Sequence, residues 1–324
     1  MSPPARPLVA VLGASGYLGS AVAAELAARP LRLRLVGRRR CAPPADAAAS
    51  VETREVDLTA PGEAARAVAD ADAVVHLVAH TTDAANWRAA ELDPHAERIN
   101  VGLMRSVVEA LRAQHRPGRR PPTVVFAGSV SQVGRSGPVD GSEPDEPVTV
   151  YARQKLAAER LLTAATAEGL LRGVSLRLPT VYGRGPGPQG RGVVLAMTHR
   201  ALAGEPLTLW GTGAVERDLL HVADAARAVA ACLDHADELA GRHWPVGTGD
   251  PVTVAQLFTA IARSVAARTG RPPVPVRCVE PPRTATETDA RGTVVDSSAF
   301  RSVTGWRPRM PLRQALDDLV AALA

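Results

Sequence analysis

Short apolar runs alternate with longer segments of helical periodicity along the first 180 residues. This alternation predicts strands separated by helices, the pattern of βαβ units. The strands are expected at Leu8–Leu12, Leu31–Val36, Val51–Val56, Ala73–Val78, Thr123–Ala127 and Val174–Leu178. The helices are expected at Tyr17–Ala28, Pro61–Ala69, Pro94–Gln114 and Tyr151–Glu168. Because such crossovers are right-handed, we expect a Rossmann-type, doubly wound parallel sheet.

The pattern changes after about residue 180, where residues 182–191 are rich in Gly and Pro. Beyond them, helical periodicity returns at Val193–Ala203, Ala223–His235, Val254–Ala267 and Leu312–Leu323, between isolated short strands. We therefore expect an α/β protein of two parts. A Rossmann domain is expected to consist of residues 1–180 together with 218–247. A smaller mixed α/β lobe is expected to consist of residues 181–217 and 248–324. The lobe is expected over the carboxyl edge of the sheet, where such folds bind ligands.

Composition excludes several classes of protein. The 324 residues are 46% hydrophobic and 22% charged, which is typical of a globular chain and not of a disordered or fibrous one. The net charge is +5, but the Arg residues are scattered between acidic residues, so we expect no nucleic-acid partner. No apolar run approaches the roughly 18 residues of a membrane span, and no signal-peptide pattern is present. We therefore expect a cytoplasmic protein without a membrane partner.

The cysteines predict neither disulfides nor a metal site. Cys41, Cys232 and Cys278 are odd in number, far apart in sequence and without C-x-x-C spacing. We expect reduced thiols.

The glycine spacing after the first expected strand favours nucleotide binding. Gly13, Gly16 and Gly19 form a G-x-x-G-x-x-G pattern that opens the first expected helix. Glycine permits a tight turn and lets the backbone approach a pyrophosphate, while the helix N-terminus offers unpaired N–H groups. In this position the pattern predicts a dinucleotide site.

The residues after the second expected strand favour NADP(H). NAD-binding units usually carry an acidic residue there for the ribose 2′-hydroxyl. This chain has Arg38, Arg39 and Arg40 instead. Guanidinium groups bind a 2′-phosphate through paired, charge-assisted hydrogen bonds, so Arg38 and Arg39 are the expected contacts. The alternative is a solvated basic loop.

A tyrosine and the chain's single lysine stand one helical turn apart. Tyr151 and Lys155 open an expected helix, and their spacing of four places both on one face. Reduction of a carbonyl needs a proton at its oxygen, and a phenol with a pKa of about 10 needs help to supply one near pH 7. We expect the Lys155 ammonium to lower the pKa of Tyr151 and to contact the nicotinamide ribose.

Two serines follow the fifth expected strand. A hydroxyl at this carboxyl edge would donate a hydrogen bond to the substrate carbonyl beside Tyr151. Ser129 is the first candidate and Ser131 the second, and the sequence leaves the choice open.

These residues resemble the extended short-chain dehydrogenase/reductase family, the NAD(P)-dependent epimerases, dehydratases and reductases of nucleotide sugars. The resemblance covers nearly the whole chain. Besides the glycine turn and the set of Ser129, Tyr151 and Lys155, it rests on Asp57-Leu58, Asn100, Leu176–Gly183, Arg217-Asp218 and Gly305–Pro308.

The resemblance implies a larger cofactor site. It places Asp57 and Leu58 beside the adenine, Leu77 to Ala79 along the cofactor and Pro179 near the nicotinamide. The expected cofactor-binding residues are Gly13, Ser15, Gly16, Tyr17, Leu18, Gly19, Arg38, Arg39, Asp57, Leu58, Leu77, Val78, Ala79, Asn100, Tyr151, Lys155 and Pro179.

The resemblance also implies a substrate site and a partner. Arg217 matches the segment that contacts the pyrophosphate of a nucleotide sugar, and Arg283 or Arg291 would be a second contact. The other expected substrate contacts are His80, Ser131 and Thr180, the last standing where many relatives carry Asn. Relatives pair through the helices that match Pro94–Gln114 and Tyr151–Glu168, so a homodimer is expected.

Departures from the family pattern narrow the reaction. The 4,6-dehydratases place an Asp-Glu pair after the catalytic hydroxyl, whereas Val130 and Ser131 stand here. The segments around Pro179 and Ala201 are similar to those of 4-ketoreductases of deoxysugar biosynthesis. We therefore expect NADPH-dependent reduction of a dTDP-4-keto-6-deoxyhexose. The alternatives are a nucleotide-sugar 4-epimerase and a non-catalytic NADP-binding protein of the same fold.

Overall fold

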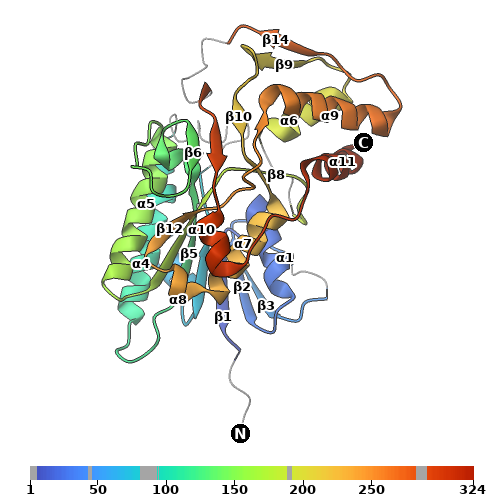
Figure 1. Ribbon diagram of the computed structural model, residues 1–324. Helices are drawn as coiled ribbons and strands as arrows, with labels where there is room; N and C mark the ends of the chain where they lie inside the picture. The colour runs from blue at the N-terminus through green and yellow to red at the C-terminus, as the bar shows by residue number, and fades with distance from the viewer. Residues whose placement is uncertain (1–5, 43–45, 81–92, 94, 188–191, 282–289) are drawn as a thin grey trace.

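A seven-stranded parallel sheet forms the centre of the molecule (Figure 1). The computed structural model describes residues 6–42, 46–80, 93, 95–187, 192–281 and 290–324. The strand order is β12-β7-β5-β4-β1-β2-β3, and every neighbouring pair is parallel. The strands are β1 (Leu8–Leu12), β2 (Arg32–Gly37), β3 (Ser50–Glu55), β4 (Ala73–His76), β5 (Thr123–Ser129), β7 (Arg172–Leu178) and β12 (Arg242–Pro245). The expected doubly wound sheet is confirmed, and its strand order reverses between β1 and β4, where such sheets bind ligands.

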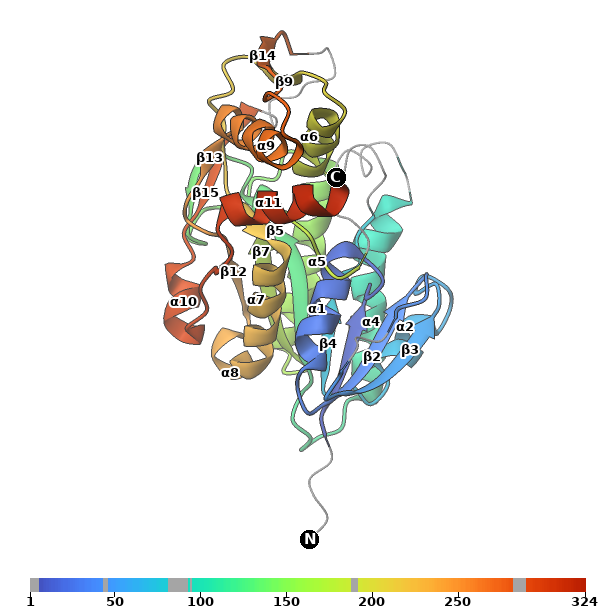
Figure 2. The same cartoon turned by 90° about the vertical axis from the view of Figure 1, so that its right-hand side faces the viewer.

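Helices cover both faces of the sheet (Figures 1 and 2). Alternate strand residues point to opposite faces, so Val9 and Val11 join one apolar cluster while Leu8, Ala10 and Leu12 join the other. The first cluster includes α1 (Tyr17–Ala27) and α7 (Val222–Asp234). The second includes α2 (Glu63–Val68), α4 (Leu103–Gln114) and α5 (Val150–Ala167).

One expected helix is interrupted by a wider turn. The segment expected as a single helix from Pro94 enters α4 through a π-helical turn, η1 (Arg98–Gly102). Pro94 itself lies outside the described residues. Such turns are frequent at functional sites, and this one carries Asn100.

A second, smaller body of helices and short strands lies over the carboxyl edge of the sheet (Figures 1 and 2). Its core joins the helices α6 (Val193–Leu202), α9 (Val254–Thr269) and α11 (Leu312–Leu323) to β9 (Leu207–Trp210), which pairs with β14 (Val276–Val279). A four-stranded sheet consists of β13 (Val252–Thr253), β10 (Glu216–Arg217), β15 (Thr293–Val295) and β6 (Gly137–Val139). The remaining elements are β8 (Thr180–Tyr182), β11 (Leu219–His221), η2 (Val130–Val133), α8 (Ala236–Leu239) and α10 (Ser298–Thr304).

The late segment 218–247 contributes to both bodies. It supplies α7, which packs on α1, and β12, which extends the large sheet beside β7. Asp218 accepts hydrogen bonds from the backbone N–H groups of Thr248 and Gly249. The assignment of 218–247 to the Rossmann domain stays a prediction.

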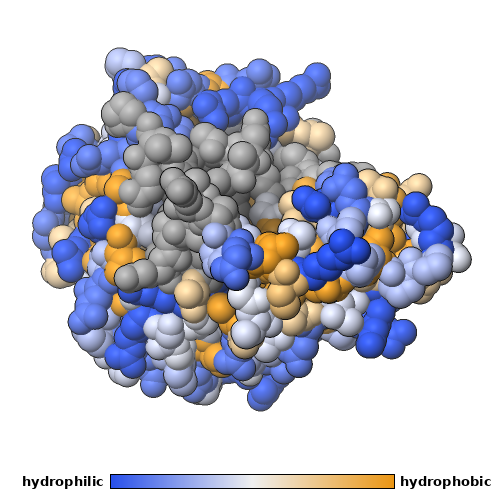
Figure 3. Space-filling view, turned by 90° about the horizontal axis from the view of Figure 1, so that it is seen from above, coloured by the Kyte–Doolittle hydropathy of each residue, from blue (hydrophilic) through white to orange (hydrophobic). Residues whose placement is uncertain are grey.

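Within the described ranges, none of the helices combines the length and apolarity that a membrane crossing requires. In the view from above, hydrophilic residues predominate around the rim, with smaller hydrophobic patches between them (Figure 3). Cys41, Cys232 and Cys278 are all free thiols.

Candidate active site

The glycine-rich turn joins β1 to the first turn of α1. Gly13 has φ of +88°, and a Cβ at this position would lie 3.2 Å from the Val78 nitrogen. A Cβ at Gly19 would lie 2.0 Å from the Gly13 oxygen, so the helix packs against the turn only because residue 19 is glycine. Gly16 is the N-cap of α1, and no side chain caps the helix there. The free N–H groups and the closeness of the backbone fit a bound pyrophosphate.

The basic residues after β2 lie beside this turn. Arg39 donates a hydrogen bond to the Ser15 oxygen (3.4 Å), and Arg38 and Arg39 are both exposed. Hydrogen bonds from Thr59 hold the pKa of Asp57 below its usual range, and the positive charge of Arg38 acts in the same direction. Leu58 is buried beside Asp57. This arrangement leaves two guanidinium groups facing solvent at the end of β2.

Asn100 links the segment after β4 to α5. Its Oδ1 accepts from the His80 N–H (2.7 Å), and its Nδ2 donates to Gln154 Oε1 (2.8 Å). The segment from Leu77 to Ala79 follows β4 and leads to His80. It runs beside the Gly13 turn. The His80 imidazole contacts Asp93 at 2.9 Å. Whether His80 also faces substrate stays a prediction.

Tyr151 and Lys155 lie in the first turns of α5. The Thr149 hydroxyl caps the helix by accepting from the Ala152 N–H (3.1 Å). Lys155 is 3% exposed, and its Nζ lies 5.8 Å from the centre of the Tyr151 ring. The expected one-turn juxtaposition is therefore present at the start of a buried helix face.

The electrostatics of this pair differ from the expectation. Burial raises the pKa of Tyr151 to about 12 and lowers that of Lys155 to about 8. Removal from water sets the direction of the Tyr151 shift, so the lowering of its pKa that we expected from the ammonium is wrong. A phenol with this pKa keeps its proton at neutral pH, which suits a proton donor.

Lys155 has hydrogen-bonding capacity to spare. An ammonium carries three donors, and across the described ranges its acceptor is the Ala127 oxygen at 2.8 Å. A buried ammonium with two further N–H groups fits the hydroxyls of a nicotinamide ribose.

The two candidate serines form a hydrogen-bonded pair. Ser129 Oγ and Ser131 Oγ are 2.8 Å apart, and the Ser131 N–H donates to Ser129 Oγ at 3.2 Å. Both hydroxyls are partly buried at the carboxyl end of β5. The structure brings the two candidates together, so the choice between them stays open.

Two of the candidate substrate residues, Thr180 and Arg217, lie on strands that follow β7. Pro179 precedes β8, which begins at the exposed Thr180. Arg217 on β10 donates to the Arg291 oxygen, and Arg291 donates to the Gly134 oxygen just after η2. Arg217 and Arg291 are thus neighbours close to the serine turn, while Arg283 lies outside the described residues.

Three buried polar side chains escaped the sequence analysis. His76 on β4 is 1% exposed, and neither ring nitrogen finds a hydrogen-bond partner in the described part of the chain. Burial and the charge of Lys155 lower the pKa of His76 to about 3, so the imidazole is neutral. Glu159 and Arg177 form a buried ion pair behind the serine turn. The position of Glu159 four residues after Lys155 was a signal that it shares the helix face of Lys155, but not that Arg177 is its partner.

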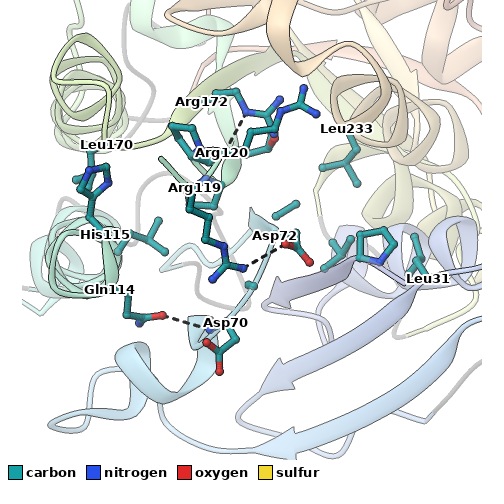
Figure 4. A pocket seen from close by; sticks show the side chains of 18 of the residues that line it. Leu31, Asp70, Asp72, Gln114, His115, Arg119, Arg120, Leu170, Arg172 and Leu233 are labelled. Atoms are coloured by element: carbon teal, nitrogen blue, oxygen red, sulfur yellow. Dashed lines mark hydrogen bonds and ion pairs between the residues drawn. The ribbon is translucent and has the colours of Figure 1, made fainter. Parts of the chain in front are cut away.

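A cavity of about 410 Å³ opens at the opposite, amino edge of the sheet (Figure 4). Arg119 pairs there with Asp72 at 3.4 Å, and the Asp70 N–H donates to Gln114. The Arg119 and Asp72 side chains are both 49% exposed. The cavity is remote from the glycine turn and the Tyr151 pair, so it is not part of the candidate site. Among the described residues, no cluster of three or more His, Cys, Asp or Glu side chains is arranged to hold a metal ion.

Comparisons with known proteins bear on the family and the fold. Residues 9–247 match the model of the NAD dependent epimerase/dehydratase family. The dTDP-6-deoxy-L-talose 4-dehydrogenase (NAD(P)(+)) of Kitasatospora kifunensis is 32% identical over 98% of this chain and 96% of its own length. A solved structure of MoeE5 with UDP-glucose and NAD has a TM-score of 0.80 and 28% identity over 98% of this chain and all of its own. The structure of RMD from Pseudomonas aeruginosa with NADPH, at 22% identity, shares the fold, with a TM-score of 0.76 over 98% of each chain.

Proposed function

From the premise that this chain belongs to the NAD dependent epimerase/dehydratase family and modifies a sugar nucleotide, we propose that it reduces the C4 ketone of a dTDP-4-keto-6-deoxyhexose with NADPH. One observation carries this proposal: the phenol of Tyr151 and the buried amine of Lys155 share one face of α5 at the carboxyl edge of the sheet. The glycine turn, Arg38 and Arg39 would hold the dinucleotide, whose reduced nicotinamide supplies the hydride.

Tyr151 is the proton donor in this proposal. As C4 gains a hydride, its oxygen becomes basic and takes the proton from the phenol, leaving a phenolate. The Lys155 ammonium stabilises that phenolate, and water from the bulk then restores the proton. Ser129, Ser131 or both donate a hydrogen bond to the same oxygen and stabilise its developing charge.

Two observations favour ketoreduction within the family. The turn after β5 carries Val130 and Ser131, which lack the carboxyl groups that eliminate water from a sugar. The Kitasatospora kifunensis relative, which matches this chain over 96% of its length, is named for dehydrogenation at C4 of a dTDP-sugar. That reaction is the reverse of the proposed step.

The proposal is tested by incubating the protein with NADPH and a panel of dTDP-4-keto-6-deoxyhexoses. We expect one equivalent of NADPH to be consumed for each 4-hydroxy sugar formed. A nucleotide-sugar 4-epimerase would instead invert a 4-hydroxy sugar with no net change in cofactor, and that result would replace the proposal. Binding of NADPH without turnover of any sugar in either assay would indicate the non-catalytic alternative.

The proposed preference for NADPH depends on the basic residues after β2. We expect Arg38→Asp to weaken NADPH binding by roughly 10- to 100-fold, the loss of one charge-assisted pair with a phosphate, and to leave NADH binding nearly unchanged. Dissociation constants from cofactor fluorescence check this. Arg40→Asp is the matched control, since it changes the charge of the same exposed segment equally. Tighter binding of NADH than of NADPH by the unaltered protein would overturn the preference.

A further inference from the structure

Glu159 extends the face of α5 that carries Tyr151 and Lys155. The three residues are spaced by four, so they lie one above another along the helix. The Glu159 side chain is 6% exposed, and its carboxylate contacts side chains of β7 and η2. It therefore contacts no proposed ligand and needs another explanation.

The Glu159 carboxylate is fixed from several directions. Arg177 donates to Oε1 at 2.5 Å, and Ser175 donates to Oε2 at 2.6 Å. Burial would raise the pKa of Glu159, but the hydrogen bonds and charge of Arg177 hold it below its usual range. Arg177 in turn contacts Asp145 at 2.7 Å in the segment that leads into α5. The carboxylate is thus a charged, immobile acceptor anchored to β7.

Gln132 connects this acceptor to the serine turn. Its Nε2 donates to Glu159 Oε2 (3.0 Å), and its Oε1 accepts from the Ser129 N–H (2.8 Å). Gln132 is fully buried in η2, directly after Ser131. One amide side chain therefore spans the distance from the helix of Tyr151 to the backbone of Ser129.

Gly128 leaves the space that this link occupies. A Cβ at residue 128 would lie 2.9 Å from Gln132 Oε1 and 3.0 Å from Ser175 Oγ. Glycine at the end of β5 is therefore required by the side chains packed against it, although its φ is not positive.

We propose that Gln132 and Glu159 are positioning residues, which hold the hydroxyls of Ser129 and Ser131 in register with the phenol of Tyr151. The inference rests on the proposed function. Hydroxyl donors stabilise a developing oxyanion only when they are held within a few tenths of an ångström of the productive position. The Ser129–Gln132–Glu159 chain supplies that constraint by joining the donor turn to the helix that carries the acid.

The test compares two substitutions that each remove one hydrogen bond to Glu159 Oε2. Gln132→Met also frees the Ser129 N–H, whereas the control Ser175→Ala leaves the serine turn untouched. We expect amide exchange in the segment 128–133 to accelerate at least roughly tenfold in Gln132→Met, and kcat to fall about 10- to 100-fold with little change in KM or in NADPH affinity. Ser175→Ala should stay within about threefold of the unaltered protein in both readouts.

A charge exchange supplies the second test. Gln132→Glu and Glu159→Gln should each lower kcat, because the first places two carboxylates together and the second removes the acceptor charge from Arg177. The double variant exchanges carboxylate and amide and should recover kcat by roughly tenfold over the poorer single variant. If Gln132→Met does not fold, Gln132→Asn serves in its place, since its shorter amide cannot span both partners.

Equal exchange rates and equal kcat in Gln132→Met and Ser175→Ala would overturn the positioning role. The exchange measurement needs no substrate, so it decides the role of Gln132 whatever sugar is reduced. Failure of the unaltered protein to reduce any 4-keto sugar would instead contradict the proposed function.

Discussion

Replacing Tyr151 with Phe is expected to lower kcat by about 10²- to 10⁴-fold, the usual effect of losing a general acid. The phenyl ring preserves the packing of the first turn of α5, and the substitution removes only the hydroxyl. NADPH affinity should change little, because Lys155 and the glycine turn remain in place. Steady-state turnover of a dTDP-4-keto sugar and cofactor titration measure the two quantities separately.

Tyr182→Phe is the matched control for this experiment. Tyr182 is buried, and its ring packs edge-on against His221 with centroids 5.8 Å apart. The control should keep kcat within about threefold, far from the range expected for loss of the acid. Undiminished turnover in Tyr151→Phe would refute the assignment of the proton donor.

Arg177→Met is expected to lower the free energy of unfolding by about 3–5 kcal/mol. Arg177 has no solvent exposure, and its guanidinium is the main positive partner of the Glu159 carboxylate. Methionine fills a similar volume but leaves a buried carboxylate without its counter-charge, and that loss is strongly destabilising. Equilibrium denaturation in urea, followed by circular dichroism, gives the value.

Arg172→Met is the matched control, because it also replaces an arginine of β7 with methionine. Arg172 pairs at 2.7 Å with Asp237, whose side chain is 61% exposed. An ion pair with an exposed partner contributes about 0–1 kcal/mol, so the control should differ little from the unaltered protein. A loss in Arg177→Met no larger than in Arg172→Met would show that the buried pair does not stabilise the fold.

The parts of the site that the sequence predicts are those carried by local patterns. The glycine turn, the one-turn spacing of Tyr151 and Lys155, and the serines after β5 each depend on residues within a few positions of one another. A predicted strand has a known carboxyl end, and the carboxyl ends of parallel strands meet at one edge of the sheet. These residues therefore lie near that edge in the structure, as expected.

The parts that escape prediction depend on contacts between distant segments. Nothing near Arg242–Pro245 indicates that it pairs with β7, and nothing near Arg177 indicates Glu159 as its partner. In the sequence, His76 is only one position of an apolar strand. Its burial beside Lys155 depends on how β4 and α5 pack together, which the sequence does not show. The pKa of Tyr151 was mispredicted for the same reason, because spacing shows the ammonium nearby but not the removal of the phenol from water.

Lys155 is the chain's single lysine, and 97% of its surface is withdrawn from solvent. Reagents that acylate lysine amines therefore have one side-chain target in this chain, and it is shielded in the folded state. Most enzymes are labelled at many surface lysines at once, so inactivation by such reagents reveals little. In this chain, acylation of a lysine side chain would report directly on access to the candidate active site, and protection by a ligand would show that the ligand occupies it.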